Sequence, residues 1–225
     1  MTVTAILPVP VGFAERRDAV FAPVAGTSPL VRIVLALETA CDVVVVTAGI
    51  LADSVREALA GQNFSRVHVV VAGSTGERAQ CVAAGLLGLD DGAHVVLHDI
   101  EWPMVRAGTL DRIVAMLRAG AVAVLPSSRV TDSVKLIDAA GVLTATVDRE
   151  QLRTVQYPRG FDADVLAVLV KQSGSDAFDE LEALLSTGTP LTIIEGDDEA
   201  LSVELPRDSD YLAALIENRQ DLTGR

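Results

Sequence analysis

The sequence predicts an α/β fold, a Rossmann-like three-layer α/β/α domain with a mostly parallel sheet and an inserted β-hairpin arm. Three observations support this prediction. Short Val-rich runs alternate with longer segments of helical period. The apolar runs lack polar alternation, as expected for strands buried on both faces. One segment in the middle of the chain breaks this rhythm. We expect the 225 residues to form a single domain, 1–225.

Six Val-rich runs are expected to form the strands of the sheet. They are residues 2–7, 42–47, 67–71, 93–98, 121–125 and 191–194. Because parallel strands end at a common edge of the sheet, the residues that follow each run are candidates for a functional site.

Helix signals lie between the strands. Ser28 and Pro29 open "LVRIVLALETA", Gly61 closes "DSVREALAG", and Thr109 is expected to cap "LDRIVAMLRAG" before Gly120. Further helices are expected over "DADVLAVLVKQ", over "DAFDELEALLS" and from about residue 208 to 218.

The segment "VTDSVKLIDAAGVLTATVDREQLRTVQYP" predicts the hairpin arm, at about 130–156, because two β-branched runs flank "DAAG". The neighbouring sequence predicts no helix on which its apolar residues could pack, so we expect a second subunit to bury them. The alternative is a hairpin folded back on its own domain. The apolar residues are Val134, Leu136, Val142, Leu143 and Val147.

Composition excludes several classes of function. Lys and Arg total 18 against 31 Asp and Glu, and the net charge of -13 disfavours binding to nucleic acid or to an anionic membrane. The longest apolar run, 43–52, is too short to span a bilayer. Cys41 and Cys81 have no paired spacing, and the N-terminal segment lacks the charge order of a secretory signal. We therefore expect a cytoplasmic protein.

The loop after the first strand, "PVPVGFAERRDAVFAPVAG", is the first candidate site. A nucleotide-binding loop needs glycines that bring backbone N–H groups onto phosphates, and only Gly12 is present here. Pro8 and Pro10 remove two donors, whereas Arg16 and Arg17 supply cations. An ordinary surface loop remains the alternative.

The sequence "HDIEWPMV" after the fourth strand places His98, Asp99 and Glu101 at the edge of the sheet. A carboxylate there could hold a metal ion or a ribose hydroxyl. The alternative is that Asp99 only caps the next helix. His68 and His94 lie in or beside strands and are expected to be structural.

The arm carries hydroxyl and charged side chains suited to a phosphomonoester, which arginine can bind bidentately. The alternative is that these charged side chains serve only to keep an exposed hairpin solvated. These residues are Thr131, Asp132, Lys135, Asp148, Arg149 and Arg153.

A second charged segment, "IEGDDEALSVELPRDSD", follows the last strand. Its carboxylates could attract a cation, although a solvated turn is the simpler interpretation. They are Glu195, Asp197, Asp198 and Glu199.

Six blocks in order resemble the 2-C-methyl-D-erythritol 4-phosphate cytidylyltransferase family of the non-mevalonate isoprenoid pathway, over nearly the whole chain. The blocks are "FAPVAG", "VVAGSTGERAQCVAAGL", "VVLHDIEWPMV", "VTDSVKLID", "VDREQLRTVQYPRGF" and "IEGDDEALSVELPRDSDYL". The resemblance implies a nucleotide-diphospho-sugar transferase fold whose β-arm clasps the partner in a homodimer. It also implies that magnesium-bound CTP meets methylerythritol phosphate, a polyol phosphate, whose oxygen attacks the α-phosphorus and expels pyrophosphate.

The resemblance implies the following roles. Catalytic residues are Asp99, Lys135 and Arg149; substrate-binding residues are Thr131, Asp132, Arg149 and Arg153; nucleotide-binding residues are Arg16, Arg17, Gly73, Arg78, Cys81 and Asp99. Asp99 is also the residue that would hold Mg²⁺.

The chain departs from the family pattern on the CTP side. Ala19 and Ser202 stand where the family has lysines, Trp102 replaces an arginine, Cys81 replaces a serine, and the loop after the first strand is shorter. Loss of one cationic partner commonly costs ~3 kcal/mol in the transition state. We therefore expect weakened catalysis. The alternatives are a non-catalytic paralogue that acts as a dimeric binding or regulatory protein, and transfer of a different nucleotide with Trp102 offering a stacking face.

Overall fold

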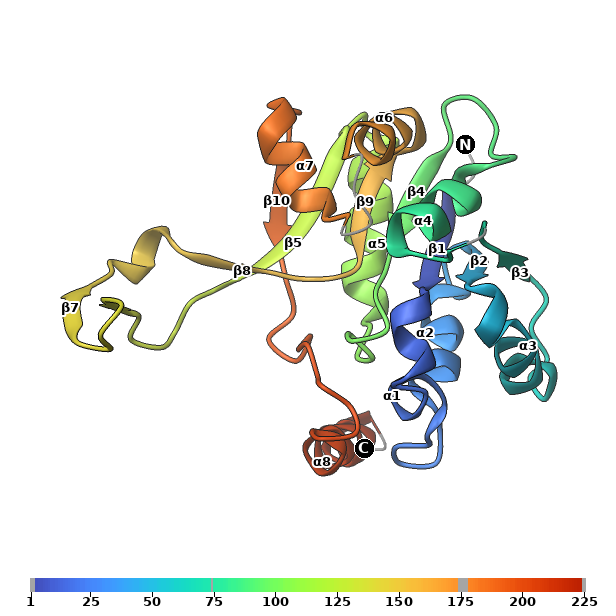
Figure 1. Ribbon diagram of the computed structural model, residues 1–225, viewed down its shortest axis with the longest axis horizontal. Helices are drawn as coiled ribbons and strands as arrows, with labels where there is room; N and C mark the ends of the chain where they lie inside the picture. Colours follow the sequence, from blue (N-terminus) through green and yellow to red (C-terminus); the bar gives the residue numbers. More distant parts are fainter. Residues whose placement is uncertain (1–2, 74, 174–177, 224–225) are drawn as a thin grey trace.

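The computed structural model describes residues 3–73, 75–173 and 178–223. Its main sheet has the strand order β10-β5-β9-β4-β1-β2-β3, with β8 paired to β5 (Figure 1). All six predicted strands are present. They are β1 (Val3–Val9), β2 (Asp42–Thr47), β3 (Val67–Val71), β4 (His94–Leu97), β5 (Ala123–Arg129) and β10 (Thr192–Glu195). β1 is parallel to β2 and β4, β2 to β3, and β5 to β10, which confirms a mostly parallel sheet.

Two strands that the sequence did not predict complete the sheet. β9 (Arg159–Asp162) lies between β4 and β5 and is antiparallel to both. β8 (Arg153–Val155) pairs antiparallel with the end of β5. Gly160 allows β9 to lie close under the neighbouring helix, because a Cβ there would come 2.6 Å from the Ile113 side chain. The antiparallel insertion therefore separates β4 from β5 at the centre of the sheet.

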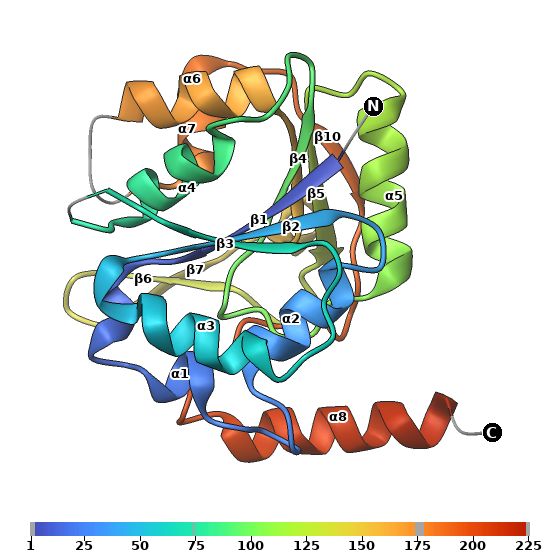
Figure 2. The same cartoon turned by 90° about the vertical axis from the view of Figure 1, so that its right-hand side faces the viewer.

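Helices cover both faces of the sheet, so the three-layer prediction is confirmed (Figure 2). One face carries α1 (Asp18–Phe21), α2 (Pro29–Leu37), α3 (Ala52–Ala60), α5 (Ala107–Arg118) and α8 (Ser209–Thr223). The other face carries α4 (Arg78–Leu86), α6 (Ala163–Ser173) and α7 (Glu180–Thr187). Short 3₁₀ helices follow β1 (Val11–Ala14) and β2 (Gly49–Leu51), and a third lies in the arm (Arg149–Gln151). None of the helices in the described ranges is long and apolar enough to cross a bilayer.

Two of the three predicted helix boundaries are confirmed. The Ser28 side chain accepts a hydrogen bond from the Val31 N–H, and α3 ends at Gly61. The cap assigned to Thr109 is wrong. α5 already begins at Ala107, so Thr109 lies inside its first turn, where its hydroxyl accepts a hydrogen bond from Arg112.

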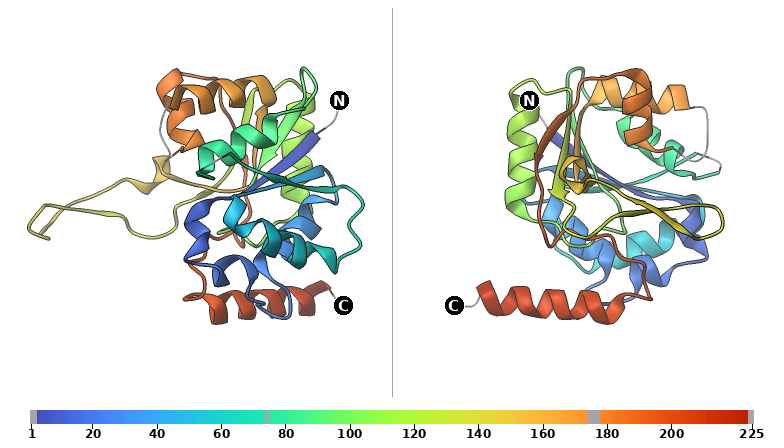
Figure 3. Two further views of the ribbon diagram at one scale, coloured as in Figure 1. Left: turned by 45° about the vertical axis from the view of Figure 1, so that its right-hand side comes forward. Right: turned by 90° about the vertical axis from the view of Figure 1, so that its left-hand side faces the viewer.

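The hairpin arm projects from the body of the domain (Figures 1 and 3). Its strands, β6 (Lys135–Ile137) and β7 (Leu143–Thr146), form a separate two-stranded sheet. The Asp138 carboxylate closes the turn by accepting hydrogen bonds from Ala140 and Val142 N–H, and Gly141 adopts a φ of 79° there. Leu136 and Leu143 are 54% and 60% exposed, so the arm does not fold back on its own domain.

Candidate functional site

The C-terminal ends of β1 and β4 meet at one edge of the sheet, because the two strands are parallel neighbours. After β4 the chain turns sharply. The buried His98 ring holds the turn through a 2.9 Å hydrogen bond between its Nε2 and the Trp102 carbonyl oxygen. Burial lowers the pKa of His98 to about 4, so the ring is neutral at pH 7 and Nε2 is the donor. Asp99 accepts a 3.0 Å hydrogen bond from the Glu101 N–H, so it shapes this turn and caps no helix.

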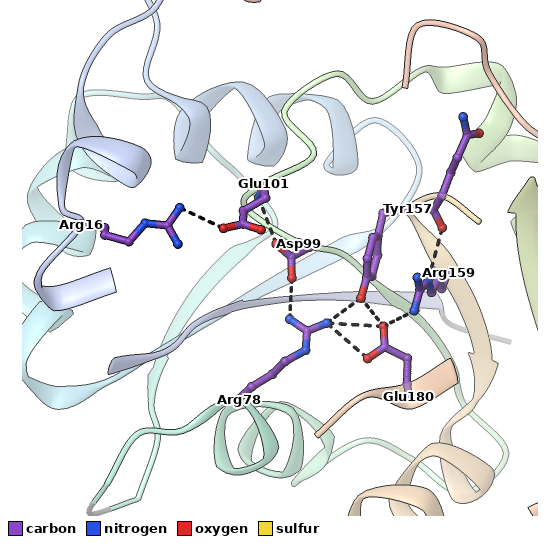
Figure 4. Close-up of polar contacts among 8 residues, drawn as sticks. Arg16, Arg78, Asp99, Glu101, Tyr157, Arg159 and Glu180 are labelled. Carbon is purple, nitrogen blue, oxygen red and sulfur yellow. Dashed lines mark hydrogen bonds and ion pairs between the residues drawn. The ribbon is translucent and has the colours of Figure 1, made fainter. Parts of the chain in front are cut away.

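Asp99 is also the outermost member of a partly buried ion network (Figure 4). Its Oδ2 lies 2.7 Å from Arg78 NH1, and Arg78 NH2 lies 3.3 Å from a carboxylate oxygen of Glu180. The Tyr157 hydroxyl contacts both Arg78 and Glu180, and Arg159 NH1 lies 2.9 Å from Glu180. Burial alone would lower the pKa of Arg78, but the negative charges of Glu180 and Asp99 raise it, so this arginine stays charged. Arg78 therefore fixes the Asp99 carboxylate at the edge of the sheet.

The loop after β1 offers one of its two arginines to this site. Arg16 forms a 3.0 Å ion pair with Glu101, whereas Arg17 bonds to Ser54 in α3. The Val11 N–H donates to the Gly76 carbonyl oxygen at 2.8 Å, so this amide is already engaged within the protein. The structure therefore brings Arg16, and not Arg17, next to the Asp99 turn.

Gly73, Gly76 and the start of α4 lie under this edge of the sheet. Cys81 is fully buried, and its thiol donates to the Gly76 carbonyl oxygen. Burial raises the pKa of Cys81 to about 12. Gly73 has open space around its Cα, whereas Gly76 is packed against Ala48. Cys81 thus faces the core, and Gly73, unlike Gly76, has open space where a ligand could approach.

The segment after β10 forms a further wall of the site. The Val203 N–H donates to the Glu101 carbonyl oxygen at 2.8 Å, so Ser202 is adjacent to a residue anchored to the Asp99 turn. Ala19, the other position where the family pattern has a lysine, is 2% exposed in α1. A lysine at position 19 would therefore have to leave the apolar core.

The acidic segment 195–199 is held by arginines. Arg106 lies 2.8 Å from Asp197 and 2.6 Å from Glu199, and Arg219 lies 2.8 Å from Glu199. Hydrogen bonds from Arg106 and Arg219 lower the pKa of Glu199. Asp197 and Glu199 are therefore held in ion pairs with arginines, whereas Glu195 and Asp198 are exposed, as a solvated turn predicts. No group of three metal-binding side chains exists among the residues that the structure describes.

The cationic side chains of the arm are only partly brought together. Arg149 donates to the Thr131 carbonyl oxygen, whereas the Lys135 ammonium donates to the Thr146 hydroxyl at 2.8 Å. Arg153 donates to the backbone carbonyls of its own segment. In the described ranges, no hydrogen bond or ion pair connects any of these cations to Asp99.

Two arm carboxylates have different positions. Asp148 accepts a 3.0 Å hydrogen bond from the Glu150 N–H and so caps the 3₁₀ helix Arg149–Gln151. Asp132 is exposed. Asp148 therefore has a local structural role that competes with ligand binding.

An open cavity of about 1060 Å³ lies between the base of the arm and the end of β10. Its walls come from the start of α5, from the end of β5 and from residues 193–199, and they include Thr131 and Arg153. Gln156 holds the floor of the adjoining loop, since its side chain bonds the Asp197 N–H and the Asp197 and Ala200 carbonyl oxygens. Gly196 packs on Gln156 so closely that a Cβ would lie 2.0 Å from its Oε1.

Sequence reasoning missed Tyr157, Arg159 and Glu180. Glu180 is 1% exposed and lies 102 residues from Arg78 in the chain, so no local pattern connects the two. The Tyr157 ring contacts Arg159, whose guanidinium lies 4.0 Å from the ring centroid, and also lies near the Trp102 ring, with the two ring centroids 5.8 Å apart. What marks Glu180 as important is that a charged side chain is buried. Burial of this kind is a property of the folded structure, and the sequence alone does not reveal it.

The donor set around Asp99 fits one magnesium ion that carries most of its own ligands. Each Asp99 oxygen accepts one hydrogen bond within the described ranges and keeps a further lone pair, and the side chain is 21% exposed. Magnesium is commonly held by one or two carboxylates together with waters and substrate phosphates. A metal that arrives with a nucleotide triphosphate is therefore compatible with this single carboxylate.

A family model described as 2-C-methyl-D-erythritol 4-phosphate cytidylyltransferase (IspD) matches residues 12–218. The enzyme of that name from Nocardia farcinica is 35% identical over 225 residues, which cover 98% of this chain and 96% of the relative. The Rhodococcus jostii enzyme is 35% identical over 210 residues, 92% of this chain and 90% of the relative.

Solved structures show the same fold. The Thermus thermophilus 2-C-methyl-D-erythritol 4-phosphate cytidylyltransferase superposes with a TM-score of 0.75 at 23% identity, covering 96% of this chain and 100% of that chain. The 4-diphosphocytidyl-2C-methyl-D-erythritol synthase from Anaerococcus prevotii superposes with a TM-score of 0.78 at 17% identity, covering 96% and 98%.

Proposed function

This chain belongs to the 2-C-methyl-D-erythritol 4-phosphate cytidylyltransferase family of isoprenoid biosynthesis, and from that premise we propose that it transfers a cytidylyl group from CTP to methylerythritol phosphate with weakened catalysis. The observation that carries the proposal is the 2.7 Å contact between Arg78 and Asp99 at the C-terminal edge of the sheet. This contact holds a carboxylate where a nucleotide and its metal would lie.

The reaction is an in-line displacement at phosphorus. An oxygen of the acceptor phosphate forms a bond to the α-phosphorus of CTP, and the bond to the pyrophosphate oxygen breaks. The protein contributes positioning and neutralisation of charge. Asp99 would hold the magnesium ion, which when bound lowers the negative charge of the phosphates. Arg78 orients the Asp99 carboxylate through their 2.7 Å ion pair.

Arg16 is the cation best placed to replace a missing lysine. It pairs with Glu101 at 3.0 Å, but the two side chains are 44% and 38% exposed. An exposed ion pair is worth only about 0–1 kcal/mol, so Arg16 can exchange Glu101 for a phosphate at little cost. The buried Ala19 and the neutral Ser202 offer no such charge. We therefore attribute to this site a poorly held pyrophosphate and a slow reaction.

We further propose a cytoplasmic homodimer that forms through the arm. Thr131 and Arg149, which are in contact at the base of the arm, would hold the acceptor phosphate. Because the arm projects away from its own domain (Figure 3), these residues are available to a second copy of the chain.

A non-catalytic, dimeric binding protein is the second candidate. The observation in its favour is that the loop after β1 has lost its family pattern, with the Val11 N–H already donating to Gly76. Such a protein would keep the scaffold and the grip on a polyol phosphate without turning over CTP.

Calorimetry with CTP and magnesium tests the nucleotide half of the site. We expect weak binding that requires magnesium and that Asp99→Asn reduces at least about tenfold, equivalent to about 1.4 kcal/mol. Asp91→Asn is the matched control, because Asp91 is an exposed carboxylate in the turn before β4. Equal CTP affinity for the wild type and Asp99→Asn, or no CTP binding at all, would favour the non-catalytic candidate.

A further inference from the structure

A second cavity lies where the C-terminal helix α8 packs near α2. Figure 2 shows α8 running along the end of the domain that carries α1 and α2. The cavity has a volume of about 260 Å³, and its walls come from α2, from α8 and from the segment 103–105, which leads from the Asp99 turn to α5. It shares no lining residue with the cavity at the base of the arm, and Asp99 does not line it. It is therefore separate from both places where substrate binding is proposed.

Most of the wall of this cavity is apolar. Met104 and Ile216 are 4% and 3% exposed, and Pro103 is also buried. Ala36 and Val105 complete this surface. Apolar walls offer water few hydrogen-bond partners, so the cavity favours a hydrocarbon group over water. Its volume is just below the range of about 300–1,000 Å³ that is usual for drug-sized ligands, so the occupant is a small molecule.

Arg32 of α2 brings a positive charge into this apolar wall. Its NH2 donates to the Val24 carbonyl oxygen at 2.9 Å, whereas its Nε is buried and has no hydrogen-bond partner among the described residues. No carboxylate of the described ranges forms an ion pair with it. Burial and the neighbouring charge of Arg219 both lower the pKa of Arg32. An anion that accepts hydrogen bonds from this guanidinium would therefore stabilise the site.

The second arginine of the cavity already has anionic partners. Arg219 Nε lies 2.8 Å from Glu199, and Arg219 NH2 lies 3.5 Å from Asp197. These two carboxylates repel a ligand that carries more than one negative charge. The cavity therefore favours a monoanion such as a carboxylate, and disfavours a dianion such as a phosphate ester.

We propose that this cavity binds a small aliphatic carboxylate, with its hydrocarbon chain against Met104 and Ile216 and its carboxylate on Arg32. An arginine can hold a carboxylate through two parallel N–H···O bonds. The carboxylate supplies the anion and the acceptor that Arg32 lacks, and the chain fills the space between the apolar walls. The inference does not depend on turnover of CTP, because neither nucleotide nor metal enters it.

Methionine methyl NMR tests the site on the intact chain. In protein labelled with methyl-¹³C methionine, the methyl group of Met104 reports on the cavity, whereas Met116 of α5 does not line it. We expect hexanoate to shift the Met104 signal saturably, with a dissociation constant of about 1 mM or less, and to leave the Met116 signal in place. The variants Met104→Leu and Met116→Leu assign the two signals.

Two further probes separate the contributions of charge and chain. Hexanol keeps the chain but lacks the charge, and acetate keeps the carboxylate but lacks most of the chain. Each should bind at least about tenfold more weakly than hexanoate, because a charged hydrogen bond or several buried methylene groups are lost. Hexanol that binds as tightly as hexanoate would overturn the anion site, and acetate that does so would overturn the apolar one.

Two substitutions test the same two contributions from the side of the protein. Arg32→Gln should weaken hexanoate binding at least about tenfold, because it removes the positive charge. Ala36→Leu should weaken it to a similar extent, because the larger side chain fills the cavity. The matched controls are Arg118→Gln and Ala115→Leu, at exposed positions of α5 that do not line the cavity. Both controls should bind hexanoate as the wild type does.

Urea unfolding separates a binding defect from a folding defect. Arg32→Gln also loses the hydrogen bond to Val24, so its unfolding midpoint is measured first without hexanoate. Added hexanoate should raise the midpoint of the wild type and of both controls, but not that of Arg32→Gln or Ala36→Leu. A Met104 signal that does not move in the wild type, or equal hexanoate affinity in the wild type, Arg32→Gln and Ala36→Leu, would overturn the proposal.

Discussion

Glu180 is the residue on which the candidate site is built. Its carboxylate is 1% exposed and contacts Arg78, Arg159 and the Tyr157 hydroxyl. A buried charge is stable only when its partners remain, because removal of one partner leaves the others without compensation. Glu180 therefore determines, through Arg78, where the Asp99 carboxylate lies.

Replacement of Glu180 by glutamine should destabilise the fold strongly. The variant keeps the shape of the side chain but leaves Arg78 and Arg159 buried without their shared anion, so we expect a loss of about 3–5 kcal/mol in the free energy of unfolding. Urea denaturation followed by circular dichroism measures it. Glu182→Gln, an exposed carboxylate on the same helix, should change the free energy by less than about 0.5 kcal/mol. A Glu180→Gln variant as stable as the Glu182→Gln control would show that the network is not structural.

The two thiols should be inert in the native protein. Burial raises the pKa of both Cys41 and Cys81 to about 12, so at pH 8 only about one thiol in ten thousand is a thiolate. Ellman's reagent at pH 8 should therefore report both thiols only after unfolding in guanidinium chloride. Release of one equivalent within minutes from the folded protein would contradict the buried positions of Cys41 and Cys81.

Among the elements, the arm is the one whose apolar side chains a single copy of the chain leaves uncovered. The hairpin β6–β7 pairs with no other strand in the described ranges and leaves Leu136, Ile137, Val142 and Leu143 between 54% and 66% exposed. An isolated hairpin is at best marginally stable in water, so a second copy that covers this apolar face would stabilise it. The segment thus connects the fold to the proposed dimer.

Sedimentation velocity at micromolar concentration tests that dimer. We expect a dimer for the wild type and a monomer for the double variant Leu136→Asp with Leu143→Asp. Since both side chains are exposed within the chain, the unfolding free energy of the variant should match that of the wild-type monomer to within about 1 kcal/mol. Val168→Asp, at a residue that is 51% exposed on α6, should leave the dimer unchanged. A dimer that persists in the arm variant would place the interface elsewhere.

At the scale of the whole molecule, the periodicity of the sequence predicted the sheet better than the site. The six Val-rich strands are all present because buried parallel strands leave a continuous apolar run. β9 was not predicted because it begins with Arg159, a charged residue that the sequence pattern would place on the surface. In the structure Arg159 is buried, where Glu180 balances its charge. Asp99 was found from its place after β4, whereas the partners that position it come from α4, α7 and β9. Contacts between distant segments were thus the part that the sequence did not reveal.

Two substitutions restore the family pattern without restoring the site. Ala19→Lys and Ser202→Lys return the two missing lysines. However, Ala19 lies in the apolar core at 2% exposure. The loop after β1 also still lacks the glycines whose backbone N–H groups would bind phosphate. We expect the double variant to recover little of the cytidylyltransferase activity. Its initial rate of pyrophosphate release can be compared with that of the Ser202→Lys single variant, and a recovery of more than about tenfold would contradict this account.

The most direct measurement is a coupled pyrophosphate assay on the purified wild-type chain with CTP, magnesium and methylerythritol phosphate, beside an intact family member. The missing cations are expected to leave the negative charge of the transition state poorly neutralised, so the rate should be at least about a thousandfold lower than that of the intact enzyme. The residual rate should depend on methylerythritol phosphate and disappear in Asp99→Asn. Turnover of about one per second in the unmodified chain would contradict the account and show that other cations of this site replace the missing lysines.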